Sequence, residues 1–319
     1  GYHMREAGSN AIQELAFTFA NAIEYINTCI SRGLKVDEFA PRLSFFFCCT
    51  MDFFEEVAKF RAARRIYAKI MKERFGAKNE KSTHLRFHVQ TSGESLTAQQ
   101  VDNNVVRVTL EALSAVLGGC QSLHTNSRDE ALALPTEESV KVALRTQQII
   151  ANETGVTKTV DPLSGSHYLE YLTSKIEEGV EKYLKKIEKL GGSLAAIEKG
   201  YFQEEIRRNA YQLKKEIDYN DRIIVGVNKF QDQNDIEPQL NTIDPEIEIR
   251  QVKKLIEFKN NRDQTKVSSE ISKLRKFAER EVENLMPHII SAVKGHVTLG
   301  EISDVFVDIF GRYEPKFSF

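Results

Sequence analysis

Three short segments of this sequence have the pattern of β-strands but carry polar side chains where a buried strand is normally apolar. They span residues 41–49, 83–90 and 119–126, and a long helical pattern follows each of them. Repeated strand–helix units predict a parallel sheet or barrel, whose strands are almost entirely apolar. A buried polar side chain without a partner costs roughly 2–7 kcal/mol. The pattern therefore predicts a polar ligand along one face of the sheet.

Apolar residues recur at helical spacing before and between these segments. The pattern covers residues 7–31, 52–75 and 97–117, and Pro135 and Thr136 open a fourth helix. A terminal helix followed by three strand–helix units is the order expected at the end of an eight-stranded barrel. We therefore predict an α/β fold, the carboxy-terminal part of a TIM (β/α)8 barrel followed by a mostly helical region. A partial barrel does not close by itself.

The sequence changes character near residue 161. Residues 161–166 have the composition of a turn, and long, charged, amphipathic helical patterns follow them. We predict a partial barrel over residues 1–160. Residues 161–319 are then a helical linker or subunit-contact region, with one short strand near residues 222–228.

Composition bears on whether the protein binds nucleic acid, spans a membrane or is intracellular. The chain has 319 residues and a net charge of −2, which gives no electrostatic reason to expect nucleic acid. Its four cysteines show no CxxC pairing and fit the reduced core of an intracellular protein, so we expect a cytoplasmic location. The longest apolar run, residues 43–49, is too short to span a membrane. Because the first methionine is Met4, we expect the natural amino terminus to lie upstream.

Five groups of short strings resemble the methylmalonyl-CoA mutase family in both order and spacing. They are GYHMREAG at 1–8, TSG at 91–93 with SLTAQ at 95–99, QSLHTN at 121–126 with DEALALP at 129–135, VDPLSGS at 160–166, and VGVNK at 225–229. Each string alone is a weak signal. Together they make the chain similar to this family over essentially its whole length.

The resemblance implies an adenosylcobalamin-dependent acyl-CoA mutase that performs a radical carbon-skeleton rearrangement. The first expectation is conversion of (R)-methylmalonyl-CoA to succinyl-CoA. Isobutyryl-CoA, 2-hydroxyisobutyryl-CoA and ethylmalonyl-CoA are alternatives, because the residues that select the substrate in the family lie mainly outside this chain. The family threads the CoA ester along the barrel axis, and this would explain the polar strand residues.

The same resemblance implies partners. The chain lacks the family's amino-terminal segment and roughly the first five strands of the barrel. It also has no Asp-x-His-x-x-Gly string, the family motif whose histidine ligates cobalt. The cobalt ligand is therefore expected from another chain or domain. The expected partners are an acyl-CoA substrate, a small cobalamin-binding subunit or domain and a GTPase chaperone, in a dimer or heterotetramer.

Three residues near the start of the chain are the candidates closest to the chemistry. The resemblance places His3 beside the substrate thioester, where a proton shared with the carbonyl oxygen stabilises the radical. It implies that Tyr2 shields the radical from solvent and that Glu6 reaches the corrin. The alternatives are a flexible chain end for His3 and Tyr2, and a first-turn helix acid for Glu6.

The resemblance assigns six residues to the acyl-CoA substrate: Arg42, Ser44, His88, Gln90, Gln121 and Ser122. Arg42 and Ser44 share a strand face by the period-two rule, and a guanidinium suits phosphate. His88 and Gln90 also share a face. The alternatives are an arginine paired at the barrel rim for Arg42 and a hydrogen-bonded core histidine for His88.

Four further residues are assigned to the cofactor, in addition to Glu6: Gly93, Glu130, Ala131 and Leu134. Gly93 would allow a flat cofactor to approach closely, and its alternative is an ordinary strand-to-helix turn. Ala131 and Leu134 are otherwise loop-packing residues. Reactive sites of such barrels lie at the carboxyl ends of the strands, where all four residues are expected.

Two functions from other classes compete with the mutase. One is a non-catalytic scaffold, a truncated homologue that survives as an interaction module. The other, which ignores the resemblance, is a phosphate-binding barrel enzyme of unrelated chemistry. If the chain is a mutase, we expect it to be inactive alone because the radical would lack most of its enclosure.

Overall fold

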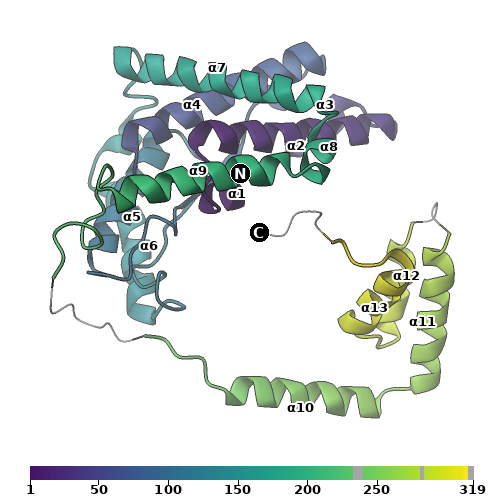
Figure 1. Ribbon diagram of the computed structural model, residues 1–319. Coiled ribbons are helices and arrows are strands. Elements are labelled where there is room, and N and C mark those ends of the chain that lie inside the picture. The colour runs from purple at the N-terminus through teal and green to yellow at the C-terminus, as the bar shows by residue number, and fades with distance from the viewer. Residues whose placement is uncertain (233–239, 281–283, 315–319) are drawn as a thin grey trace. The chain divides into compact units, whose positions relative to one another are not determined.

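The computed structural model of the chain describes residues 1–232, 240–280 and 284–314 (Figure 1). These residues form two compact units, Gly1–Thr242 and Ile243–Phe319, and each is described by itself. The units do not divide at the predicted boundary after residue 160. Residues 161–232 instead pack within the first unit, because α7 (His167–Lys189) lies against α2 (Ala11–Ser31) and α4 (Phe53–Lys69).

The first unit contains a parallel sheet of three strands in the order β1, β2, β3. The strands are β1 (Phe45–Cys49), β2 (Phe87–Thr91) and β3 (Ser122–His124). Each falls within or overlaps a predicted strand segment, and a helix follows each one. The structure thus confirms a mixed α/β fold with a small parallel sheet. The closed eight-stranded barrel stays a prediction.

The first unit contains six more α-helices in its described residues. They are α1 (Tyr2–Glu6), α3 (Val36–Phe39), α5 (Asn103–Leu117), α6 (Glu137–Asn152), α8 (Ser193–Glu198) and α9 (Tyr201–Asp218). Thr136 caps α6 by accepting a hydrogen bond from the Ser139 amide, as the predicted helix start requires. Gly200 has a φ of +70° and separates α8 from α9.

The core of the first unit lies between the sheet and its covering helices. Phe47 and Phe87 from the sheet meet Phe60 from α4, and the Phe60 and Phe87 ring centroids are 5.2 Å apart. On the other side of α2, Phe17 stacks on Phe202 at 4.2 Å. Burying one such ring contributes about 1.5–3 kcal/mol, so this face of the sheet supplies much of the stability.

The predicted strand at residues 222–228 is wrong. This segment forms turns with one isolated bridge between Val225 and Lys229. The Asn228 side chain accepts a hydrogen bond from the Ile224 amide at 2.7 Å, and Gly226 has a φ of +84°. The segment contains strand-forming residues, but these local bonds fold the backbone back on itself before it can pair with a sheet.

The second unit is helical. It contains α10 (Glu246–Asn261), α11 (Gln264–Ala278), α12 (Met286–Lys294) and α13 (Leu299–Phe310). Val267, Leu274 and Ile302 belong to a small core between α11, α12 and α13, whereas α10 has no buried residue. In the described parts of both units, no helix combines the length and the apolar character needed to span a bilayer.

Candidate functional site

The two faces of the sheet differ in composition and exposure. Phe47 and Val89 point to one face and are fully buried in the core. Phe46, His88 and Ser122 point to the other face, where they lie in register across the three strands and are half-buried to exposed. Two of the predicted polar residues, His88 and Ser122, therefore share one face with Phe46, turned away from the aromatic core. We call it the open face.

Tyr2 and His3 lie at the edge of the open face because α1 packs against β1. The Tyr2 ring stacks on Phe46 with centroids 4.6 Å apart and is only 8% exposed, so this residue is not a frayed chain end. His3 is exposed and lies edge-on to Phe46 at 6.2 Å. The His88 ring is 5.2 Å from Phe46 on the other side. Phe46 thus brings the two histidines to one surface.

His88 and Ser122 are hydrogen-bonded across neighbouring strands, with Nδ1 2.7 Å from Oγ. Burial, and then the proximity of His124, lowers the pKa of His88 below its ordinary value of 6.5. The imidazole is therefore neutral at neutral pH, so it can both donate and accept a hydrogen bond. A neutral, half-buried histidine suits an uncharged part of a ligand.

Gln90 is two residues after His88 on β2 and therefore lies on the same face. Its side-chain nitrogen Nε2 donates a hydrogen bond to Asn126 Oδ1 at 2.9 Å. Asn126 is fixed in turn by Thr91, whose hydroxyl accepts from the Asn126 amide at 2.9 Å. Asn126 Nδ2 also donates to the Thr91 carbonyl at 3.0 Å. This network holds the amide of Gln90 in one orientation on the open face.

Glu6 holds the loop that follows β2. Its carboxylate accepts hydrogen bonds from the Ser92 hydroxyl at 2.8 Å and from the Gly93 and Glu94 amides at 3.0 Å each. Glu6 is the last residue of α1, which excludes the first-turn alternative. The loop is therefore tied to the helix that carries His3, while a contact between Glu6 and corrin stays a prediction.

Gly93 lies where a side chain would meet two carboxylates. A Cβ at this position would be 3.2 Å from Glu6 Oε2 and 3.5 Å from Glu130 Oε1. Burial, and then the charge of Glu6, raises the pKa of Glu130. Ala131 and Leu134 follow in the next loop and are exposed. The four residues assigned to the cofactor thus lie in two loops at the carboxyl ends of the strands.

Three residues assigned to the substrate lie at the opposite end of the strands. Arg42 ends a 3-10 helix, Ala40–Arg42, so the prediction that it shares a strand face with Ser44 is wrong. The strand β1 begins only at Phe45, after this helix and two further residues. Ser44 is exposed directly before β1. Gln121 accepts from the Phe87 amide at 2.7 Å and so extends the sheet.

The arrangement follows the direction of the strands. Arg42 and Ser44 lie at the amino end, His88 and Ser122 in the middle, and Gly93 beyond the carboxyl end. Strands rise about 3.3 Å per residue, so the series spans roughly 20 Å. That length suits an extended ligand with a charged end and an uncharged end.

Comparison with known proteins decides the family. The family model described as methylmalonyl-CoA mutase matches residues 1–312. The chain belongs to the methylmalonyl-CoA mutase family. It is 49% identical over 314 residues to the 2-hydroxyisobutanoyl-CoA mutase large subunit of Aquincola tertiaricarbonis, covering 98% of this chain and 56% of that protein.

Methylmalonyl-CoA mutases from other organisms are also similar to the chain. That of Rhizobium meliloti (strain 1021) is 44% identical, with 98% of this chain and 44% of that protein covered. The human mitochondrial enzyme is 42% identical, with 99% of this chain and 42% of that protein covered. The chain spans about half the length of the mutase-family relatives it matches.

Sequence reasoning missed a buried charge network beneath the site of this family member. Lys59 on α4 is fully buried, and its Nζ lies 2.7 Å from Glu14 Oε2 and 2.5 Å from Glu56 Oε2. It also donates to the Cys48 carbonyl at 2.7 Å. Burial alone would lower the pKa of Lys59, but the two carboxylates raise it above its ordinary value, so it stays charged. The available signal was a lysine among the apolar residues of a predicted helix.

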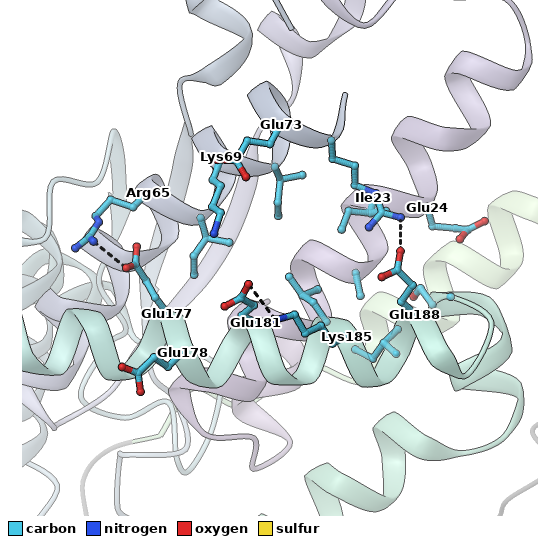
Figure 2. A pocket seen from close by; sticks show the side chains of 18 of the residues that line it. Ile23, Glu24, Arg65, Lys69, Glu73, Glu177, Glu178, Glu181, Lys185 and Glu188 are labelled. Carbon is cyan, nitrogen blue, oxygen red and sulfur yellow. Dashed lines mark ion pairs between the residues drawn. The ribbon is translucent and has the colours of Figure 1, made fainter. Parts of the chain in front are cut away.

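A cavity of about 640 Å³ lies outside the candidate site, between α2, α4 and α7 (Figure 2). Figure 2 shows its charged walls pairing with each other, as in the Arg65–Glu177 pair at 2.9 Å and the Lys185–Glu181 pair at 3.3 Å. None of the residues assigned to substrate or cofactor lines it. The candidate site and this cavity are therefore separate features of the first unit.

Proposed function

We propose that this chain is the carboxy-terminal barrel part of the large subunit of an adenosylcobalamin-dependent acyl-CoA mutase. The reaction is a carbon-skeleton rearrangement, with (R)-methylmalonyl-CoA to succinyl-CoA as the first candidate. The 49% identity to a 2-hydroxyisobutanoyl-CoA mutase large subunit favours that substrate as the second candidate. The observation that carries the proposal is the line of polar side chains along the open face, ending at the Gly93 loop.

In this proposal, different polar residues contact different parts of the acyl-CoA substrate. Arg42 at the amino end is exposed and can bind a CoA phosphate through its fork of donors. Ser44 and Gln121 lie at the same end. The neutral pair His88–Ser122 and the amide of Gln90 suit the uncharged pantetheine and thioester portions. This order threads the thioester toward the carboxyl ends of the strands.

His3 is the candidate catalytic residue. It is exposed at the edge of the open face, and the buried Tyr2 ring beneath it fixes the helix on Phe46. From there His3 can donate a hydrogen bond to the thioester carbonyl as negative charge develops on its oxygen. Tyr2 excludes water from the same side.

The loops at the carboxyl ends fit one rim of a flat cofactor. Gly93 leaves no side chain in the way, and the exposed apolar Leu134 offers a contact to a macrocycle. When bound, adenosylcobalamin supplies the radical chemistry. Within residues 1–232, 240–280 and 284–314, no group of three or more His, Cys, Asp or Glu side chains could hold a metal ion. In this proposal the cobalt ligand comes from another chain or domain.

The proposal includes partners. A relative named as a large subunit supports a small cobalamin-binding subunit as the partner, in a dimer or heterotetramer. A GTPase chaperone is proposed from the family resemblance alone. We propose a cytoplasmic location for this chain, although the mouse and human relatives are named as mitochondrial enzymes.

The test is His3→Ala in the complete protein, assayed with the small subunit, adenosylcobalamin and each of the two candidate acyl-CoA substrates. We expect kcat to fall about 10²–10⁴-fold while acyl-CoA affinity changes much less. The control is His84→Ala, an exposed histidine outside the open face that we expect to leave kcat unchanged. Equal losses in kcat and affinity would limit His3 to a positioning role, and a complete wild-type protein inactive on both substrates would overturn the proposed function.

A further inference from the structure

The helix that carries the candidate catalytic histidine is too short to hold its own position. α1 spans five residues and includes Tyr2, His3 and Glu6. Helix nucleation is unfavourable, and isolated helices below about 12 residues are marginal in water. Contacts outside the helix must therefore fix its orientation.

Arg5 makes several of these contacts. One guanidinium nitrogen lies 3.1 Å from Thr50 Oγ1, 3.2 Å from Glu56 Oε1 and 3.4 Å from Glu55 Oε1. The other donates to the Ser9 carbonyl at 2.9 Å, just after the helix. The side chain is only 10% exposed. Arg5 thus points into the protein, toward α4 and the residue that follows β1.

The acceptor of Arg5 is itself held rigidly. Glu56 is fully buried, and its other oxygen lies 2.5 Å from Lys59. Lys59 in turn bonds Glu14 on α2 and the Cys48 carbonyl on β1. The carboxylate that receives Arg5 is therefore tied to α2, α4 and β1 at once. Charge-assisted bonds of this kind are shorter and about twice as strong as neutral ones.

We propose that Arg5 is a positioning residue of the mutase reaction, which fixes α1 so that His3 and Tyr2 keep their place at the open face. This inference rests on the proposed function. Removing the guanidinium would leave Glu56 bonded to Lys59 and Thr50, but Glu14 and Glu56 would then share the single charge of Lys59. A shift of about 1 Å in a group that meets the substrate can cost up to ~100-fold in rate.

The chain offers a matched control for Arg5. Arg61 on α4 is 11% exposed and also bonds two carboxylates and a threonine: Glu170 at 2.7 Å, Asp161 at 3.1 Å and Thr173 at 3.2 Å. It ties α4 to α7 and has no contact with α1. A merely structural role for Arg5 would make the two arginines equivalent.

The experiment compares Arg5→Gln, Arg5→Lys and Arg61→Gln in the complete protein with its small subunit and cofactor. We expect Arg5→Gln to lower kcat about 10- to 100-fold with KM changed less than about threefold. Arg61→Gln should leave kcat unchanged. Both variants should lower the thermal midpoint, Arg5→Gln by more because Glu56 is fully buried whereas Asp161 and Glu170 are partly exposed. Arg5→Lys keeps one charge on Glu56 and should restore part of the lost rate.

Hydrogen exchange separates this inference from the proposed function, because it needs no turnover. The amides of residues 4–9 should exchange faster in Arg5→Gln than in wild type, and Arg61→Gln should leave them unchanged. Wild-type exchange in Arg5→Gln, or equal loss of kcat in both glutamine variants, would overturn the positioning role. If wild type itself is inactive on both candidate substrates, the proposed function fails, and the exchange result alone then decides whether Arg5 anchors α1.

Discussion

The two faces of the small parallel sheet are built from neighbouring residues of the same strands, yet one face is packed in the core and the other is accessible. Phe47 points into an aromatic core and is fully buried, whereas Phe46, the residue before it, lies half-buried between Tyr2 and His88. Apolar burial concentrates on the first face, and polar side chains concentrate on the second. The comparison teaches that a single step along a strand separates a packed apolar surface from an accessible polar one, which is the surface proposed to bind the ligand.

The largest expected effect comes from the packed face. We predict that Phe47→Ala lowers the free energy of unfolding by about 3–5 kcal/mol, because it removes a buried ring and leaves a cavity. The matched change Phe46→Ala should cost only about 1 kcal/mol, since that ring is partly exposed already. Denaturant unfolding of both variants measures the difference. Equal losses would show that the two faces are not separated as described.

A smaller effect on the free energy of unfolding is expected at a buried acid on the packed side of the sheet. Glu111 on α5 is fully buried, and burial raises its pKa well above the ordinary value of 4.5, while Ser95 offsets this in part. A raised pKa means that the folded protein holds the proton more tightly than the unfolded chain. Stability should therefore fall as pH rises from about 4.5 through the raised pKa.

We predict that Glu111→Gln removes this pH dependence. The variant should gain about 1–3 kcal/mol over wild type at pH 8, as expected when a buried ionisable group loses its desolvation cost, and little at pH 4.5. Unfolding at the two pH values measures it. Parallel stability profiles for wild type and variant would contradict the assignment of a raised pKa to Glu111.

The smallest expected effect comes from the open face. His88→Ala should weaken acyl-CoA binding to the complete protein by about 0.5–1.5 kcal/mol, up to roughly tenfold, because one neutral hydrogen bond is lost. Its free energy of unfolding should change by less than about 0.5 kcal/mol. Calorimetric titration measures the first quantity and denaturant unfolding the second. A large loss of stability without a loss of affinity would contradict this prediction. It would instead support the alternative that His88 is a hydrogen-bonded core histidine.

The parts of the fold that could be predicted from the sequence are those that depend on residues close together in the chain. The three strands, the cap at Thr136 and the shared face of His88 and Gln90 follow from periodicity and side-chain chemistry within a few residues. The strand predicted at 222–228 failed because the hydrogen bonds of Asn228 override strand propensity.

The missed features depend on contacts between distant residues. Glu14 and Lys59 are 45 positions apart, and no local pattern indicates that they meet. The link from Glu6 to the loop after β2 joins residues more than 80 positions apart. The strand face predicted for Arg42 is wrong for a local reason, because a 3-10 helix over Ala40–Arg42 precedes the strand. The predicted closed barrel would need strands in addition to the three described.

The central claim is that the open face holds the acyl-CoA thioester. The most direct measurement is a crystal structure of the complete protein with its small subunit and a non-reactive thioether analogue of the substrate. We predict that the analogue runs along the strands within hydrogen-bonding distance of His88, Gln90 and Ser122, with its carbonyl at His3. An analogue bound elsewhere, or an open face filled by the protein's own side chains, would contradict the account.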